Sequence, residues 1–118
     1  MEKVKLNIKN SEEKKLPSNL EAEQALIGSV LVNNEIIDEI SNIVSSHKFF
    51  DPAHRKIYTV IENLNNKGMI ANPITLKNYF ETNDSLADVG GVDYLVKLTR
   101  FSSSIKQSID YAKLIHEM

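Results

Sequence analysis

The chain has 118 residues, a formal net charge of −2 and no cysteine. This length matches one domain with one core, so a nucleotide-driven motor does not fit beside it. The charge lacks the excess of Lys and Arg with which duplex-binding proteins contact phosphates, so direct binding of nucleic acid is not expected. Without cysteine, disulfides, thiol nucleophiles and cysteine-ligated zinc are excluded.

The first 16 residues differ in composition from the rest of the chain. They hold five lysines and three glutamates among few apolar side chains. This pattern predicts a mobile N-terminal tail over residues 1–16, with a basic arm as the functional alternative. No apolar run reaches the roughly 20 residues that span a bilayer, and no signal-peptide core is present. We therefore expect a cytoplasmic protein without membrane contact.

From residue 17 onward the pattern predicts helices joined by short loops, hence an all-α fold. Ser18 and Glu21 have the spacing of a capping box, in which each side chain satisfies a backbone N–H at a helix start. The helix that follows is expected to run to about Val32. Small residues on it would let another helix approach closely: Ala25, Gly28 and Ser29.

Three more helices are expected in the bundle, over residues 17–89. One apolar stripe covers residues 36–44. Asp51 and Pro52 predict the start of the next helix, and Gly68 its end. Asn72 and Pro73 repeat this start signal for a brief helix that ends near residue 83. The bundle helices should meet at Leu26, Val30, Ile40, Ile57, Ile61 and Leu64.

The last part of the sequence predicts an antiparallel helical hairpin over residues 92–118. Gly90 and Gly91 suggest a turn with positive φ before it. The two arms, 92–101 and 105–118, are separated by three serines and are apolar on more than one face. A hairpin cannot hide two apolar faces on its own partner arm, so we expect a self-association surface, with packing of the surplus face back on the bundle as the alternative. Its predicted members are Tyr94, Leu95, Leu98, Phe101, Ile105 and Ile109.

Candidates for chemistry are few, and we predict no catalytic, cofactor-binding or metal-binding residue. No glycine precedes a lysine as a phosphate-binding P-loop requires, and a phosphate-binding turn at Gly90 and Gly91 lacks a preceding strand. His54 could be a general base, although a ring that packs and hydrogen-bonds locally is the simpler interpretation. His47 and His116 are too far apart in sequence for a helical metal pair. Three acidic residues near the glycines lack calcium-loop spacing: Asp84, Asp88 and Asp93.

Several segments together are similar to the N-terminal domain of DnaB-type replicative DNA helicases. The resemblance begins with the run Leu16 to Leu31, which contains the pattern E-A-E-x-A-x-x-G. It continues through an H-R-x-I-Y pattern at His54 to Tyr58 and a V-G-G-x-x-Y-L pattern at Val89 to Leu95. Weaker matches complete the series: Phe49-Phe50, Leu64, Gly68, Thr75-Leu76 and Tyr111 to Ile115. The order and spacing of these segments carry the resemblance.

The resemblance implies a non-catalytic collar domain of a ring-shaped hexamer. In the family, hairpins pair into dimers within the hexamer, and the collar recruits primase; a helicase loader is a further expected partner. ATP and Mg²⁺ would be bound by a motor domain beyond a linker helix, and DNA would be contacted only there. Because the sequence ends within a predicted helix, it is expected to stop before that linker.

Other function classes remain open on the sequence alone. One alternative is the helicase-binding domain of a primase, whose fold is similar. Another is an all-helical DNA-binding module, for which the acidic balance after the tail is unfavourable. An enzyme acting by itself is the least favoured, and it would be revealed if the chain hydrolysed ATP.

Overall fold

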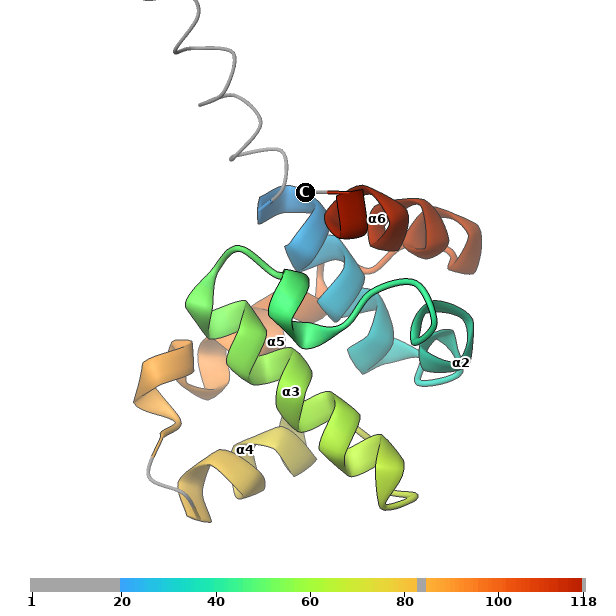
Figure 1. Ribbon diagram of the computed structural model, residues 1–118. Helices are drawn as coiled ribbons and strands as arrows, with labels where there is room; N and C mark the ends of the chain where they lie inside the picture. Colours follow the sequence, from blue (N-terminus) through green and yellow to red (C-terminus); the bar gives the residue numbers. More distant parts are fainter. Residues whose placement is uncertain (1–19, 83–84, 118) are drawn as a thin grey trace, which may run out of the picture.

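The computed structural model describes residues 20–82 and 85–117, and every regular element within these ranges is helical (Figure 1). This confirms the predicted all-α class. A first helix covers residues 20–32. The elements that follow are α2 (Ile36–Ile40), η1 (Ser46–Lys48), α3 (Pro52–Asn66), α4 (Pro73–Thr82), η2 (Ala87–Val89), α5 (Gly91–Thr99) and α6 (Ile105–Glu117). The predicted tail and the Ser18 cap lie outside the described residues.

Helix α3 begins and ends at the predicted signals. The Asp51 side chain accepts hydrogen bonds from the backbone N–H groups of Ala53 at 2.7 Å and His54 at 3.3 Å. These bonds satisfy donors that have no partner within the first turn. After the last turn, Gly68 adopts a φ of 73°, which allows the chain to leave the helix axis.

Helix α4 uses a reciprocal cap between Asn72 and Thr75. The Asn72 side chain accepts from the backbone N–H groups of Ile74 and Thr75, at 2.9 and 3.0 Å. In return the Thr75 hydroxyl accepts from the backbone N–H of Asn72 at 2.9 Å. The predicted Asn-Pro start is therefore confirmed with a polar partner that the sequence analysis did not identify.

The core lies where the first helix, α2 and α3 meet, and all six predicted bundle residues are buried there. Each of them is at most 3% exposed. Helix α2 is shorter than the predicted stripe, because the chain turns after Ile40 and enters η1. Val44 remains buried beyond the end of α2 and still contributes to the core. The helical spacing of the apolar residues therefore predicted the buried face of α2 correctly, but it predicted too long a helix.

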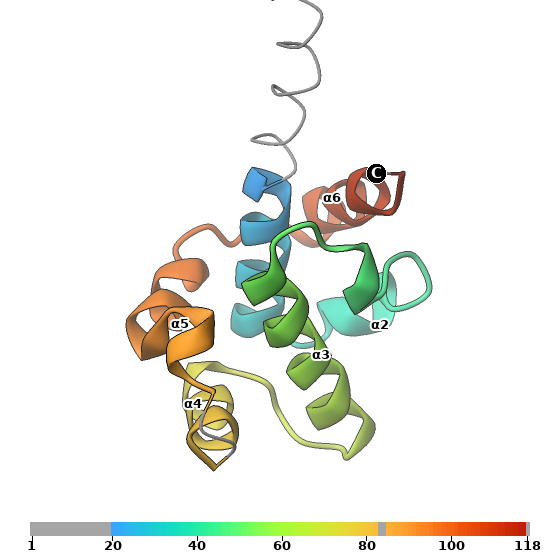
Figure 2. The ribbon, with the colours of Figure 1, turned by 60° about the vertical axis from the view of Figure 1, so that its left-hand side comes forward.

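The two C-terminal helices correct the predicted hairpin. Helix α5 packs against α4, whereas α6 packs against α2. Figure 2 shows the first helix between α5 and α6, so the two arms lie on different sides of the bundle. The physical reason is that each arm has a bundle face to cover, and this burial replaces the contact between the arms. Residues 91–117 are therefore part of the globular domain.

Glycines explain how α5 reaches the first helix. A Cβ atom added at Gly28 would lie 1.9 Å from the carbonyl oxygen of Leu98, so no larger residue fits without movement of the backbone. Next to it, the Ser29 hydroxyl accepts from the backbone N–H of Ser103 at 2.7 Å. The close approach expected at these small residues is confirmed. Gly90 and Gly91, with φ of 93° and 74°, confirm the predicted turn.

None of the helices in residues 20–82 and 85–117 combines the length and the apolar character needed to cross a membrane.

Candidate functional site

A buried polar network joins three helices at the centre of the domain. Glu23 from the first helix contacts His54 of α3, with 2.7 Å between the carboxylate Oε1 and the ring Nδ1. The opposite ring nitrogen, Nε2, lies 2.6 Å from the hydroxyl of Tyr94 on α5. The His54 and Tyr94 rings are also nearly parallel, with centroids 5.9 Å apart. Residues separated by up to 71 positions thus meet in one chain of hydrogen bonds.

The partners of this network satisfy each polar group. The Glu23 carboxylate accepts from the backbone N–H groups of Phe50 and Asp51 as well as from the ring of His54. With its proton on Nδ1, the ring leaves Nε2 to accept from the Tyr94 hydroxyl. Gln24 donates its side-chain N–H to the same hydroxyl oxygen at 3.2 Å. The buried carboxylate is therefore held by three donors.

The arrangement of carboxylate, imidazole and hydroxyl groups resembles the catalytic triad of a hydrolase. The burial of the carboxylate and the imidazole argues against catalysis. Glu23 and His54 are each only 1% exposed. Burial is the main reason that the pKa of Tyr94 is raised; the Gln24 hydrogen bond lowers it, and the carboxylates of Asp51 and Glu23 raise it. The hydroxyl is thus kept protonated, and substrate cannot reach the ring. The network serves to fix the helices to one another.

The structure supports the packing interpretation of His54 over a general base. However, its partners are not local, since Glu23 and Tyr94 lie 31 and 40 positions away. Sequence reasoning missed Glu23 as a buried group. The only available signal was that the three resemblance-bearing patterns each contribute one member of the network.

The predicted self-association residues do not form one surface. Leu95 and Leu98 are 0% exposed and belong to the domain's own core, so the structure removes them from that surface. The face of α5 that carries these two leucines covers the bundle. This packing buries the second apolar face of α5 within the domain. Tyr94 and Ile109 are partly buried against the same core. Only Phe101 and Ile105 are exposed, at 39% and 43%.

The acidic and basic candidates are surface groups. Asp88 pairs with Lys56 at 3.4 Å, with both side chains more than half exposed. Asp93 is exposed, and Asp84 lies outside the described residues. His47 bonds its Nδ1 to the hydroxyl of Ser45 at 2.8 Å. Within the part of the chain that the structure describes, no three His, Asp or Glu side chains gather in a way that could hold a metal ion.

Comparison with known proteins decides the family. The family model described as "DnaB-like helicase N terminal domain" matches residues 15–117. The chain belongs to this family. The replicative DNA helicase DnaB of Rickettsia felis is 41% identical over 103 residues, which is 87% of this chain and 21% of that protein. The corresponding protein of Buchnera aphidicola is 35% identical over 115 residues, or 96% of this chain and 25% of that protein. This DnaB-like domain therefore spans a quarter or less of the length of these curated relatives.

A solved structure supports the same assignment. The crystal structure of the N-terminal domain of DnaB helicase from Mycobacterium tuberculosis matches with a TM-score of 0.78 and 26% sequence identity. The match covers 83% of this chain and 71% of that chain. The fold shared with this DnaB-like domain extends beyond residue 89, since a match confined to the residues before it would cover less of the chain.

Proposed function

We propose that this DnaB-like domain is the non-catalytic collar of a hexameric, ATP-dependent replicative DNA helicase. In this role it supports ring assembly and recruits primase during DNA replication. The observation that carries the proposal is the family match over residues 15–117 together with relatives named as replicative helicases. The burial of the Glu23, His54 and Tyr94 network supports a scaffold role, since a rigid interior presents fixed outer surfaces.

Under this proposal, the domain and the rest of a longer protein have different functions. ATP, Mg²⁺ and DNA would be bound outside residues 1–118, because the relatives are four or more times longer than the matched region. Primase and a helicase loader would meet the outer faces of the domain. Self-association would use the exposed residues of the predicted set, Phe101 and Ile105. Val96 is a further exposed apolar residue of α5, at 43%.

The experiment compares the full-length protein with a version that lacks residues 1–118. Mass photometry reports the hexamer, and cosedimentation with the primase of the same organism reports recruitment. We expect the truncated protein to lose primase binding and to form fewer hexamers, while the isolated chain binds primase but does not hydrolyse ATP. Full primase binding by the truncated protein would contradict the proposal.

A second comparison addresses self-association alone. The double variant Phe101→Ser with Ile105→Ser should reduce oligomer formation in the full-length protein without changing the helical circular dichroism of the isolated chain. The matched control is Ile74→Ser, an isoleucine that is 69% exposed on α4. If both variants reduce assembly equally, the α5–α6 junction is not the contact.

A further inference from the structure

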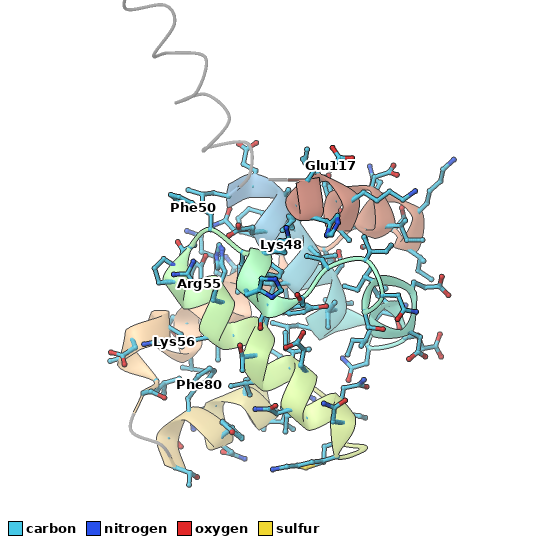
Figure 3. The ribbon with its side chains drawn as sticks, in the orientation of Figure 1. Lys48, Phe50, Arg55, Lys56, Phe80 and Glu117 are labelled. Carbon is cyan, nitrogen blue, oxygen red and sulfur yellow. The ribbon has the colours of Figure 1, made fainter. Side chains whose placement is uncertain are left out.

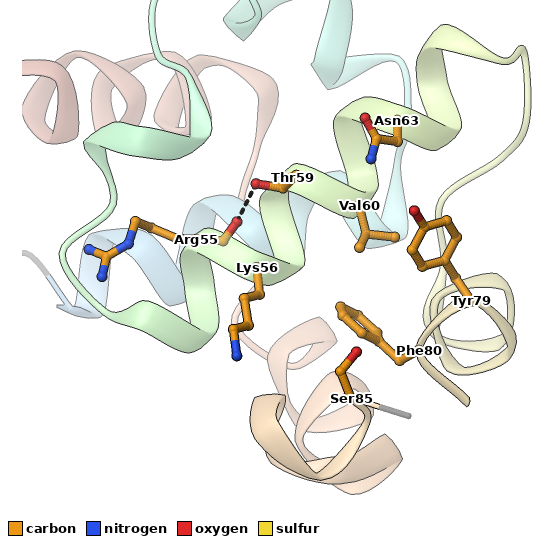
Figure 4. A pocket seen from close by; sticks show the side chains of 8 residues that line it. All are labelled: Arg55, Lys56, Thr59, Val60, Asn63, Tyr79, Phe80 and Ser85. Carbon is orange, nitrogen blue, oxygen red and sulfur yellow. Dashed lines mark hydrogen bonds between the residues drawn. The ribbon is translucent and has the colours of Figure 1, made fainter. Parts of the chain in front are cut away.

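A groove runs along the outer edge of α3 beside α4, away from the buried network. At one end a hollow of about 340 Å³ is lined by residues of α3 and α4 and by Ser85. A second hollow, of about 320 Å³, continues toward the end of α3. Tyr79 of α4 lines both hollows, so they are adjacent, and together they are called the α3–α4 groove. Figure 4 shows Tyr79 and Phe80 of α4 facing Val60 of α3 across the first hollow.

The floor of the groove is apolar and its described ends are basic. Val60 and Phe80 form the floor of the first hollow, and Leu64 and Met69 line the second. Lys56 stands at one end and Lys67 at the other, while the described residues between them are neutral. The described lining of both hollows contains no carboxylate, although the whole chain carries a net charge of −2. The groove is therefore a locally basic site on an acidic domain.

The charges at the ends are available to a partner. Lys56 meets Asp88 at 3.4 Å, but both side chains are more than half exposed, so solvent screens this pair strongly. Arg55, next to Lys56, donates to the backbone carbonyls of Phe49 and Phe50, and no carboxylate among the described residues pairs with it. Figure 3 shows Arg55, Lys56 and Phe80 along the same side of the molecule.

The length of the groove defines the size of its occupant. From Lys56 to Lys67 the helix rises about 16 Å at 1.5 Å per residue. A partner helix of about three turns has this length. Apolar side chains at positions i, i+3, i+4 and i+7 would reach the floor, and acidic side chains near its two ends would meet the lysines.

We propose that the α3–α4 groove binds an acidic amphipathic helix of a partner protein. The charge complementarity between the groove ends and acidic residues would speed association and fix orientation. Contacts with the apolar lining, of which Met69 is the most exposed member, would add affinity. The proposal goes beyond ring assembly and primase recruitment, and it does not require that the partner be primase.

The test uses a phage-displayed library of random 16-residue peptides selected against the 118-residue chain. We expect enriched peptides that combine helical apolar spacing with Asp or Glu at both ends. Their binding should weaken about tenfold in the variant Lys56→Glu with Lys67→Glu, and in Thr59→Glu, which places a negative charge in the first hollow. Lys113→Glu, an exposed lysine of α6, is the matched control and should bind as the wild type does.

A second readout locates the peptide. Amide shifts of the ¹⁵N-labelled chain on peptide addition should concentrate on α3 and α4, and circular dichroism should show that each variant remains folded. The proposal is overturned if selection enriches no peptide, or if the enriched peptides lack acidic residues. It is also overturned if the control weakens binding as much as the groove variants, or if the shifts map to α5 and α6. A failed selection with intact primase binding would reject the groove while the proposed function stands.

Discussion

Helices α5 and α6 both carry apolar side chains on more than one face, yet they contribute to the domain in different ways. Helix α5 inserts Leu95 and Leu98 fully into the core and connects Tyr94 to the buried network. Helix α6 lies on α2, and its buried side chains are one large residue, Ile115, and the small residues Ser108 and Ala112. Large buried side chains stabilise a fold more than small ones, because they remove more apolar surface from water. The comparison indicates that α5 is an integral core helix and α6 a covering helix.

The largest expected effect comes from removing a core side chain of α5. Leu98→Ala should lower the free energy of unfolding by about 2–5 kcal/mol, because it leaves a cavity where α5 crosses the first helix. Leu114→Ala on α6, where the side chain is partly exposed, should change it by less than about 0.5 kcal/mol. Urea denaturation of both variants measures the difference. Equal losses would remove the distinction between the two helices.

The next effect concerns the contact between α5 and the first helix. Gly28→Ala should destabilise the domain by about 1–3 kcal/mol, since the added methyl group collides with the Leu98 carbonyl. In an exposed helix the same change is stabilising by up to ~1 kcal/mol, so the sign of the effect is informative. Thermal denaturation gives that sign. A stabilised variant would mean that α5 does not approach the first helix this closely.

A smaller effect should follow from cutting the network at its α5 end. Tyr94→Phe leaves Nε2 of buried His54 without its donor and should cost about 1–3 kcal/mol. Tyr111→Phe on α6 is the matched control and is expected to cost less. Guanidinium denaturation of the two variants, compared at neutral pH, tests this. Identical costs would indicate that the network adds nothing beyond packing.

The smallest effect is a change of stability at alkaline pH. Burial raises the pKa of Tyr58 and Tyr94 above the ordinary value of 10.0, and a nearby Glu62 raises that of Tyr58 further. As pH rises through about 10, the unfolded tyrosines ionise first, so the unfolded state binds fewer protons and stability falls. Tyr58→Phe should make this fall shallower in denaturation curves between about pH 9 and 11. An unchanged slope would contradict the burial of its hydroxyl.

Local signals in the sequence were sufficient for much of the fold. The Asp51 and Asn72 caps, the Gly68 stop and the Gly90-Gly91 turn each act through neighbouring backbone groups, so the sequence specifies them directly. The six core residues were predicted because the helical period reports which face is apolar. The length of α2 was overestimated because the same period continued beyond its last hydrogen-bonded turn.

Long-range partners could not be obtained in the same way. An apolar face on α5 indicates that this face is buried against another helix. It does not indicate whether that helix is the first helix or α6. Likewise, Glu23 looks like a surface residue until His54 and the Phe50 backbone are brought to it by the fold. The self-association set was therefore too large, and only its exposed members, Phe101 and Ile105, remain as a prediction.

Helix α5 packs on the first helix instead of on α6, and the nuclear Overhauser spectrum of the isotope-labelled 118-residue chain tests this packing. We expect cross peaks between the α protons of Gly28 and protons of Leu98, because the Gly28 backbone lies against the Leu98 carbonyl group. Absence of these cross peaks, with strong ones between Leu98 and Ile109 of α6 instead, would contradict it.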